Sequence, residues 1–159
     1  MSAERVAVSA GFVAFALIAG ALGFQYLGGM PPCEMCHWQR WPLIGAAVVG
    51  IAGGAFATSQ RAERKHIVLL AVATLILVGI SGLIGAYQAG VEWGFLPGPA
   101  ACTGPAVLLT GSLDLNHAVV RCDIAAWRLF GISLAGYNAI ISLATASAGA
   151  FLLARPARH

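Results

Sequence analysis

Charged residues are spaced unevenly along this chain, and their spacing predicts its main elements. Four stretches contain no Asp, Glu, Lys or Arg: residues 6–33, 41–60, 66–91 and 129–154. Because an α-helix rises 1.5 Å per residue, about 20 residues cross a hydrocarbon core of about 30 Å. We expect four membrane-spanning helices at about 6–27, 41–57, 67–86 and 129–153. The predicted fold class is all-α, an integral membrane four-helix bundle in a single domain over residues 1–159.

A fifth uncharged stretch, residues 93–113, is not predicted to be a helix. It contains three prolines and four glycines: Pro97, Pro99, Pro105, Gly94, Gly98, Gly104 and Gly111. Proline removes a backbone donor, and an unpaired backbone group in lipid costs several kcal/mol. We therefore expect this stretch to lie on the membrane surface within a long loop, residues 87–128. The two shorter connections are expected at 28–40 and 58–66.

Composition agrees with a membrane protein and excludes other classes. Of 159 residues, 59% are hydrophobic and 9% are charged, whereas a soluble domain carries about 25% charged residues. A chain of this size has too little interior to bury so much apolar surface. Soluble enzymes and disordered tails are thereby excluded. The net charge of +3 is too small to indicate binding to nucleic acid.

The first hydrophobic stretch could also be compared with a cleaved signal peptide. Arg5 gives it a minimal positive start, and Ala19-Gly20-Ala21 resembles a cleavage site. The apolar core of a signal peptide is usually about 7–15 residues, shorter than this stretch. We therefore expect residues 6–27 to remain as a membrane helix.

The distribution of Lys and Arg predicts the orientation. With four helices, both termini and the 58–66 connection share one side. That side holds six of the nine positive residues: Arg5, Arg61, Arg64, Lys65, Arg155 and Arg158. Positive residues near helix ends favour the cytoplasm. The loops at 28–40 and 87–128 are then expected to face outward.

All four cysteines, Cys33, Cys36, Cys102 and Cys122, fall in these two outward loops. An even number of cysteines in an oxidising compartment indicates disulfides. A zinc site is disfavoured because zinc prefers two closely spaced pairs, and only Cys33 and Cys36 form one. Two inert structural disulfides remain an alternative, although a bond across two residues restrains the unfolded chain little. The Cys-x-x-Cys spacing favours redox chemistry, because one sulfur can resolve a mixed disulfide on the other.

Arg40 lies four residues after Cys36, so the two share a face if a helix has begun there. A helix start and a guanidinium both stabilise a thiolate. An alternative role for Arg40 is an interfacial anchor beside Trp41. The redox interpretation instead places this positive group against an electron-rich or anionic partner at the edge of the bilayer.

Together these features resemble the DsbB family, the disulfide bond formation proteins B of bacterial inner membranes. The resemblance covers nearly the whole chain. It rests on Pro32-Cys33-Glu34-Met35-Cys36 with Arg40, on the segments 90–95 and 98–102, on Cys122-Asp123 with Trp127, and on the segment 131–138. Topology, the second cysteine pair and Arg40 together are far more specific than Cys-x-x-Cys alone.

The chain departs from related sequences at two places. They often carry His after the residue that corresponds to Tyr87, where this chain has Gln88. If that His helps to bind quinone, Gln88 must substitute by hydrogen bonding, or the affinity differs. Related sequences also often have Pro shortly before the last cysteine, where this chain has Val119-Val120-Arg121.

The resemblance implies a path for electrons. A periplasmic thioredoxin-like oxidase similar to DsbA would attack a Cys102–Cys122 disulfide and form a mixed disulfide with Cys102. Cys122 would then exchange with Cys33 and free Cys36 of a Cys33–Cys36 disulfide. Cys36 would pass the electrons to membrane ubiquinone or menaquinone, and Arg40 would help to bind the quinone.

Three rival functions can be distinguished from this one. The vitamin K epoxide reductase type would place its membrane-edge Cys-x-x-Cys on the last helix. A non-enzymatic scaffold or chaperone stapled by two disulfides would show neither bound quinone nor thiol exchange. A transporter is disfavoured because no charged residue lies in the middle of a predicted helix.

Overall fold

The computed structural model describes residues 2–59, 63–103 and 120–155. Within them it has four helices long and apolar enough to cross a membrane, which confirms the predicted fold class. In order, the helices are α1 (Ala3–Tyr26), α2 (Glu34–Ala47) with its continuations η1 (Val48–Gly53) and α3 (Gly54–Ser59), α4 (Arg64–Glu92) and α6 (Leu134–Ala154). A two-stranded antiparallel hairpin, β1 (Arg128–Leu129) and β2 (Ile132–Ser133), precedes α6.

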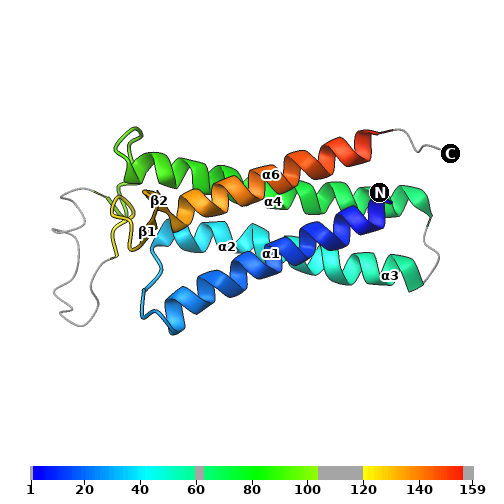
Figure 1. Cartoon of the computed structure of the whole chain (residues 1–159), viewed down its shortest axis with the longest axis horizontal. Helices are drawn as coiled ribbons and strands as arrows, with labels where there is room; N and C mark the ends of the chain where they lie inside the picture. The colour runs from blue at the N-terminus through cyan, green and yellow to red at the C-terminus, as the bar shows by residue number, and fades with distance from the viewer. Residues whose placement is uncertain (1, 60–62, 104–119, 156–159) are drawn as a thin grey trace.

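The helices run side by side along the long axis of the molecule (Figure 1). Helix α4 packs against both α2 and α6, and α1 contacts α2, α4 and α6. The beginning of α1 and the end of α6 lie at one end of the bundle, together with α3, and the hairpin lies at the other end. Two of the positive residues used to predict orientation, Arg61 and Arg158, lie outside the described residues.

The second helix begins at Glu34 and not at residue 41, so its predicted start was wrong. The sulfur of Cys33 accepts a hydrogen bond from the backbone N–H of Cys36 at 3.2 Å and thereby caps the helix. Glu34 then stands in the first turn, where a negative side chain is favourable. Charge spacing missed these turns because a helix can extend beyond the apolar part of its sequence. Consequently Cys36 and Arg40 lie one turn apart on the same helix.

The third helix, predicted to end near residue 86, continues to Glu92. Its end is a Schellman motif on Gly94, whose φ of +76° suits glycine. The backbone N–H of Phe95 donates to the carbonyl of Gly90 at 2.9 Å, and that of Gly94 donates to Val91 at 3.0 Å. This ending adds a turn and a half to the helix and places Gln88 and Glu92 inside the bundle end.

The last helix begins at Leu134 and not at residue 129, because the preceding residues form the hairpin. Phe130 and Gly131 occupy its turn with φ of 51° and 80°, and two successive positive φ values suit a tight hairpin turn. The hydroxyl of Ser133 then accepts from the N–H of Gly136 at 3.2 Å and caps α6. The described part of the 93–113 stretch, residues 93–103, contains no helix, as the prolines predicted.

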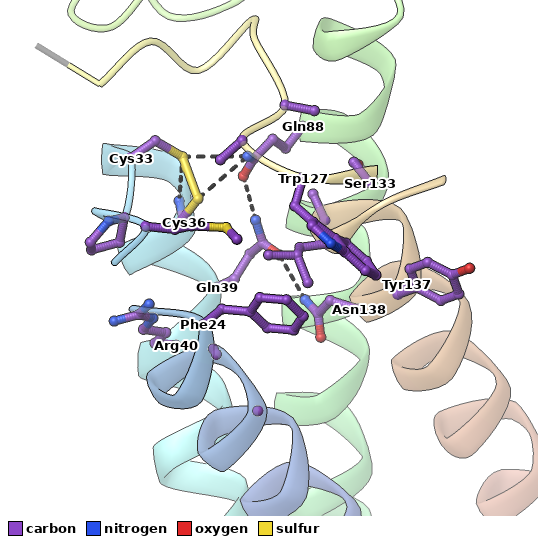
Figure 2. Close-up of a pocket in the computed structure, with 18 of the residues that line it drawn as sticks. Phe24, Cys33, Cys36, Gln39, Arg40, Gln88, Trp127, Ser133, Tyr137 and Asn138 are labelled. Carbon is purple, nitrogen blue, oxygen red and sulfur yellow. Dashed lines mark hydrogen bonds between the residues drawn. A yellow bond between two sulfur atoms is a disulfide. The ribbon is translucent and has the colours of Figure 1, made fainter. Parts of the chain in front are cut away.

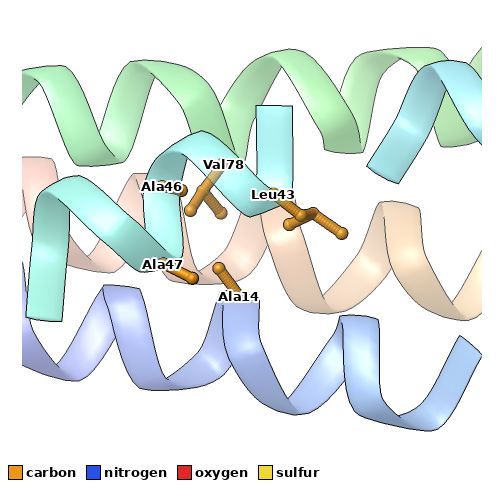
Figure 3. Packing of buried hydrophobic residues seen from close by; sticks show 5 residues of the cluster. All are labelled: Ala14, Leu43, Ala46, Ala47 and Val78. Carbon is orange, nitrogen blue, oxygen red and sulfur yellow. The ribbon is translucent and has the colours of Figure 1, made fainter. Parts of the chain in front are cut away.

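The bundle interior is built from small and aliphatic side chains. One buried cluster joins three helices: Ala14, Leu43, Ala46, Ala47 and Val78 (Figure 3). Nearer the termini, α1 and η1 approach so closely that a Cβ on Gly50 would lie 2.6 Å from the carbonyl oxygen of Ala7. A Cβ on Gly11 would lie 2.9 Å from the backbone nitrogen of Ile51. In lipid, such small residues let helix backbones pack directly.

Candidate redox site

The Cys33–Cys36 disulfide lies at the start of α2 (Figure 2). Proline at 31 and 32 leads into the cap residue, and the two Cα atoms are 5.1 Å apart. Cys33 is buried and Cys36 is partly buried. The cap directs the N–H of Cys36 at the sulfur of Cys33. Sulfur at a helix N-terminus is where a thiolate is stabilised.

The structure also pairs Cys102 with Cys122, with Cα atoms 5.4 Å apart. A backbone hydrogen bond of 2.9 Å from the N–H of Cys122 to the carbonyl of Cys102 aligns the two segments. The sequence places both residues in the long outward loop, yet Cys102 is 3% exposed and Cys122 is 1% exposed. In this conformation a protein partner cannot reach either sulfur directly.

The two disulfides share one buried cluster. Its members are Cys33, Met35, Cys102 and Cys122, with Cys36 and Val120 packed against them. Met35, inside the Cys-x-x-Cys motif, is completely buried. Thioether side chains fill irregular apolar gaps well. The arrangement brings residues far apart in sequence together and makes the two cysteine pairs neighbours.

Arg40 lies one helical turn after Cys36 and is partly buried. Its Nη1 donates to Oε1 of Gln25, near the end of α1, at 2.6 Å. Both Arg40 and Cys36 line the same cavity. Arg40 therefore borders the same space as Cys36, with one guanidinium nitrogen directed to α1.

That cavity has a volume of about 240 Å³ and lies between α1, α2, the end of α4, α6 and the segment 120–127. Much of its lining is apolar, including small residues of α1 and the rings of Phe24, Trp127 and Tyr137. The ring centroids of Phe24 and Trp127 are 5.0 Å apart, and those of Trp127 and Tyr137 are 6.3 Å apart. An apolar cavity with a few convergent polar groups is typical of a small-molecule site. Its donors and aromatic walls suit a flat ring that carries carbonyl oxygens.

Gln88 lines this cavity, and its side-chain amide is directed toward the disulfide. Its Nε2 lies 3.3 Å from the sulfur of Cys33 and 3.5 Å from that of Cys36. The same nitrogen donates to Oε1 of Glu92 at 3.0 Å. The other carboxylate oxygen of Glu92 is buried and has no hydrogen-bond partner among the described residues. Gln88 therefore contacts both sulfurs of the pair.

Sequence reasoning missed two further polar residues beside Gln88. Gln39 and Asn138 line the cavity and hydrogen-bond to each other at 2.8 Å, although they belong to different helices. The sequence did carry a sign of this contact, namely an amide side chain within an otherwise apolar span. A buried amide needs hydrogen-bond partners, so such a residue predicts a polar neighbour on another helix. A search for charged residues alone could not find it.

The segment around Cys122 carries an ion pair. The guanidinium of Arg121 donates to both carboxylate oxygens of Asp123, with Nε to Oδ1 at 2.9 Å. These bonds hold the pKa of Asp123 below its usual value. Val119, the other residue noted for the missing proline, lies outside the described residues. Among those the structure describes, no group of three His, Cys, Asp or Glu side chains could hold a metal ion.

Comparison with known proteins gives a consistent result. The family model described as disulfide bond formation protein DsbB matches residues 3–152. Proteins named disulfide bond formation protein B from Polaromonas sp. and Verminephrobacter eiseniae are 27% and 29% identical, each over 98% of this chain. The alignments cover 94% and 86% of those relatives. A namesake from Actinobacillus pleuropneumoniae is 48% identical over 42 residues, 26% of this chain and 24% of its own length.

No solved structure matches the chain significantly. The family match spans all four helices and both cysteine pairs. The chain thus belongs to the DsbB family and is a multi-pass membrane protein of disulfide bond formation.

Proposed function

We propose that this protein is a thiol:quinone oxidoreductase. It reoxidises a periplasmic DsbA-like dithiol protein and passes the electrons to ubiquinone or menaquinone in the bacterial inner membrane. The observation that carries the proposal is the shared cluster of the two disulfides, one of which borders a mainly apolar cavity with Arg40. Exchange between sulfurs needs them to be neighbours, and a lipid-soluble oxidant needs an apolar site.

The first thiol–disulfide exchange takes place at the Cys102–Cys122 disulfide, called the outer disulfide below. A partner thiolate attacks the sulfur of Cys102, a partner–Cys102 bond forms, and the Cys102–Cys122 bond breaks. Cys122 leaves as a thiolate. Because Cys102 is only 3% exposed, this step requires the segments that cover it to move aside.

The second exchange transfers the electrons inward. The Cys122 thiolate attacks Cys33, the Cys33–Cys122 bond forms, and Cys36 leaves as a thiolate. The second partner thiol then releases the oxidised partner from Cys102. The Cys102 thiolate attacks Cys122, which restores the outer disulfide and leaves Cys33 and Cys36 reduced. The net result is one disulfide made in the partner and one broken at the start of α2.

A quinone bound in the cavity would accept the two electrons and two protons as the Cys33–Cys36 bond re-forms. Arg40 would hold a carbonyl oxygen of that ring, since a guanidinium offers a planar fork of donors and keeps its charge in a partly dry site. Phe24, Trp127 and Tyr137 would flank the ring. Cys33 and Cys36 both border this cavity, and Cys36 would be the residue that passes the electrons to the acceptor.

Orientation is part of the proposal. The loops at 28–40 and 87–128 would face the periplasm, and both termini and the 58–66 connection would face the cytoplasm. Six of the nine Lys and Arg residues support this direction. After reduction, all four cysteines should react with, or be protected from, a membrane-impermeant thiol reagent as groups on the periplasmic side. Labelling of any of them only from the cytoplasm would reverse the assignment.

The decisive experiment mixes the purified protein anaerobically with a reduced thioredoxin-like oxidase and added quinone. We expect the quinone absorbance to fall as the partner becomes oxidised. Oxidation of the partner without loss of quinone absorbance would contradict the proposal that quinone is the electron acceptor.

The burial of Cys102 and Cys122 favours one alternative, a membrane scaffold or chaperone with two structural disulfides. Such a protein would form no mixed disulfide with the reduced partner and would leave the quinone oxidised. A trapping experiment separates the two: a partner whose second cysteine is replaced by alanine should accumulate as a covalent complex through Cys102 if the redox function holds.

A further inference from the structure

Three side-chain amides form a continuous chain of hydrogen bonds beneath the Cys33–Cys36 disulfide (Figure 2). Asn138 on α6 donates through Nδ2 to Oε1 of Gln39 on α2 at 2.8 Å. Gln39 donates through Nε2 to Oε1 of Gln88 on α4. Gln88 ends the chain with Nε2 at 3.3 and 3.5 Å from the two sulfurs. Each amide therefore donates toward the disulfide.

Two backbone carbonyls fix this direction. The carbonyl oxygen of Ser81 accepts from Nδ2 of Asn138 at 3.3 Å, and that of Met35 accepts from Nε2 of Gln39 at 3.4 Å. A carbonyl oxygen only accepts hydrogen bonds, so both amides must turn their nitrogen atoms to these positions. Gln39 then presents N–H to Gln88, whose oxygen must accept. The nitrogen of Gln88 is thereby turned to the sulfurs.

Glu92 holds the far end of the chain in the same direction. Its Oε1 accepts from Nε2 of Gln88 at 3.0 Å. If the amide oxygen and nitrogen of Gln88 exchanged places, the oxygen would face the Glu92 carboxylate and the nitrogen would face Nε2 of Gln39. Both hydrogen bonds would then be lost. Gln88 is 3% exposed and Gln39 is 6% exposed. Their donors are therefore largely withheld from water and stay directed inside the bundle.

We propose that Asn138, Gln39 and Gln88 act as an amide relay that stabilises the thiolate formed when the Cys33–Cys36 bond opens. Gln88 is the group that touches the reacting sulfurs, and Gln39 and Asn138 are positioning residues. The proposal rests on the proposed function only in that the bond opens during turnover. Two electrons break the S–S bond, and one proton taken from solvent or from the attacking thiol leaves one thiol and one thiolate.

The relay should make this pair more oxidising. A neutral disulfide sulfur is a weak acceptor, whereas a thiolate is a charged one, so the N–H of Gln88 favours the reduced form. A dithiol protein with a stabilised reduced form is a strong oxidant. The Cys102–Cys122 pair belongs to the same apolar cluster but receives no hydrogen bond at sulfur from any described residue. It serves as an internal reference in the same molecule.

The test measures the reduction potential of each cysteine pair in the full-length protein. Quinone-free protein in detergent is equilibrated with glutathione or dithiothreitol buffers of stated potential. The thiols are then alkylated, and mass spectrometry counts each pair separately. The variants are Gln88→Met, Gln88→Leu and Gln39→Met. Each replaces an amide N–H donor by an apolar side chain of similar size. Thr145→Val on α6 is the control, since that exposed hydroxyl donates to the backbone carbonyl of Ile141.

Gln88→Met and Gln88→Leu should each lower the equilibrium constant for reduction of Cys33–Cys36 by about tenfold or more, because they remove a hydrogen bond to a charged group. A tenfold change is about 30 mV for this two-electron couple. Gln39→Met should lower it about threefold, since it leaves Gln88 in place but frees its orientation. The Cys102–Cys122 potential should stay within error of wild type in every variant, as should both potentials in Thr145→Val.

Unchanged Cys33–Cys36 potentials in both Gln88 variants would overturn the proposal. A shift in the Gln88 variants with none in Gln39→Met would overturn the relay. An equal shift at both cysteine pairs would also overturn it, because that is the effect of general loosening. None of these measurements uses quinone or a partner protein, so failure of the relay and failure of the proposed function are separate outcomes.

Discussion

The two cysteine pairs share a buried apolar cluster but differ in their polar surroundings. Cys33 receives the N–H of Cys36 at 3.2 Å, and Gln88 approaches both sulfurs of that pair. Among the described residues, no donor approaches the sulfurs of Cys102 and Cys122. Apart from the disulfide, these two residues are joined by a backbone hydrogen bond. The same covalent link is thus built once where negative charge is stabilised and once where it is not. Electrons that enter at the second pair should therefore settle at the first.

The strongest way to break this comparison is to remove one cysteine of each pair. Cys102→Ala should abolish reaction with the partner, while Cys33–Cys36 still exchanges electrons with quinone when a small dithiol replaces the partner. Cys36→Ala should do the reverse: the mixed disulfide at Cys102 still forms and quinone stays oxidised. Partner trapping and quinone absorbance measure the two half-reactions. Equal loss of both in each variant would argue against two pairs in series.

The contact between the pairs can be tested at Met35, which is completely buried. Met35→Ala should lower the free energy of unfolding by about 2–5 kcal/mol, because it removes a large side chain and leaves a cavity between the disulfides. Circular dichroism during heating in detergent measures the loss, and dithiothreitol should then reduce both pairs faster. Ile124→Ala, at a side chain that is 62% exposed beside the second pair, is the control and should change little. A stable Met35→Ala would mean that the cluster relaxes around the gap.

Arg40 sharpens the comparison on the side of the first pair. Arg40→Lys should insert and fold normally but raise the apparent KM for quinone by roughly 10- to 150-fold, since one charge-assisted hydrogen bond contributes about 1.5–3 kcal/mol. Arg40→His should be worse. A quinone titration measures the change, and mixed-disulfide formation at Cys102 should be nearly unaffected. If Arg40→Lys matches wild type across the titration, Arg40 is an interfacial anchor.

The smallest expected effect is a pH dependence of the rate at which the Cys102–Cys122 disulfide is reduced. Hydrogen bonding from Arg121 holds the pKa of Asp123 below its usual value. A depressed folded-state pKa contributes stability above about pH 4 that is lost as the pH falls through the folded value. A phosphine reductant, which works in acid, should open Cys102–Cys122 up to about twofold faster as this carboxylate is protonated, a modest change because the ion pair is partly exposed and screened. Asp123→Asn should be faster already at neutral pH and show no such dependence.

The matched control for this ion pair is Glu63→Gln, which breaks the exposed pair with Lys65 at the opposite end of the bundle. It should leave the reduction rate of Cys102–Cys122 at its wild-type value throughout. A flat profile in the wild-type protein would show that Arg121 and Asp123 do not restrain the disulfide.

The sequence predicted the four spans well because charge is excluded from hydrocarbon regardless of tertiary contacts. It misplaced the start of α2, since Glu34 and Arg40 belong to helical turns that precede the purely apolar part of the span. Through the resemblance it noted that Gln88 stands where related sequences often carry His, but it did not predict that the amide contacts the sulfurs of Cys33 and Cys36. Which helix faces confront one another is a long-range property. For that reason the contact of Gln39 with Asn138, from distant parts of the chain, could not be foreseen from periodicity.

Substitution of the glycines of α1 is limited by different requirements at different positions along this one helix. At Gly11 any side chain would collide with η1, so variation there is limited by folding. At Gly20 a Cβ would meet nothing within 4 Å, yet the residue lines the cavity, so variation there would be limited by the room that the proposed quinone needs. Gly23 has the same open space and is not among the cavity-lining residues. A substitution library sorted once for abundance in the membrane and once for growth under disulfide stress would separate these three positions: Gly11 depleted in both sorts, Gly20 only in the second, and Gly23 in neither.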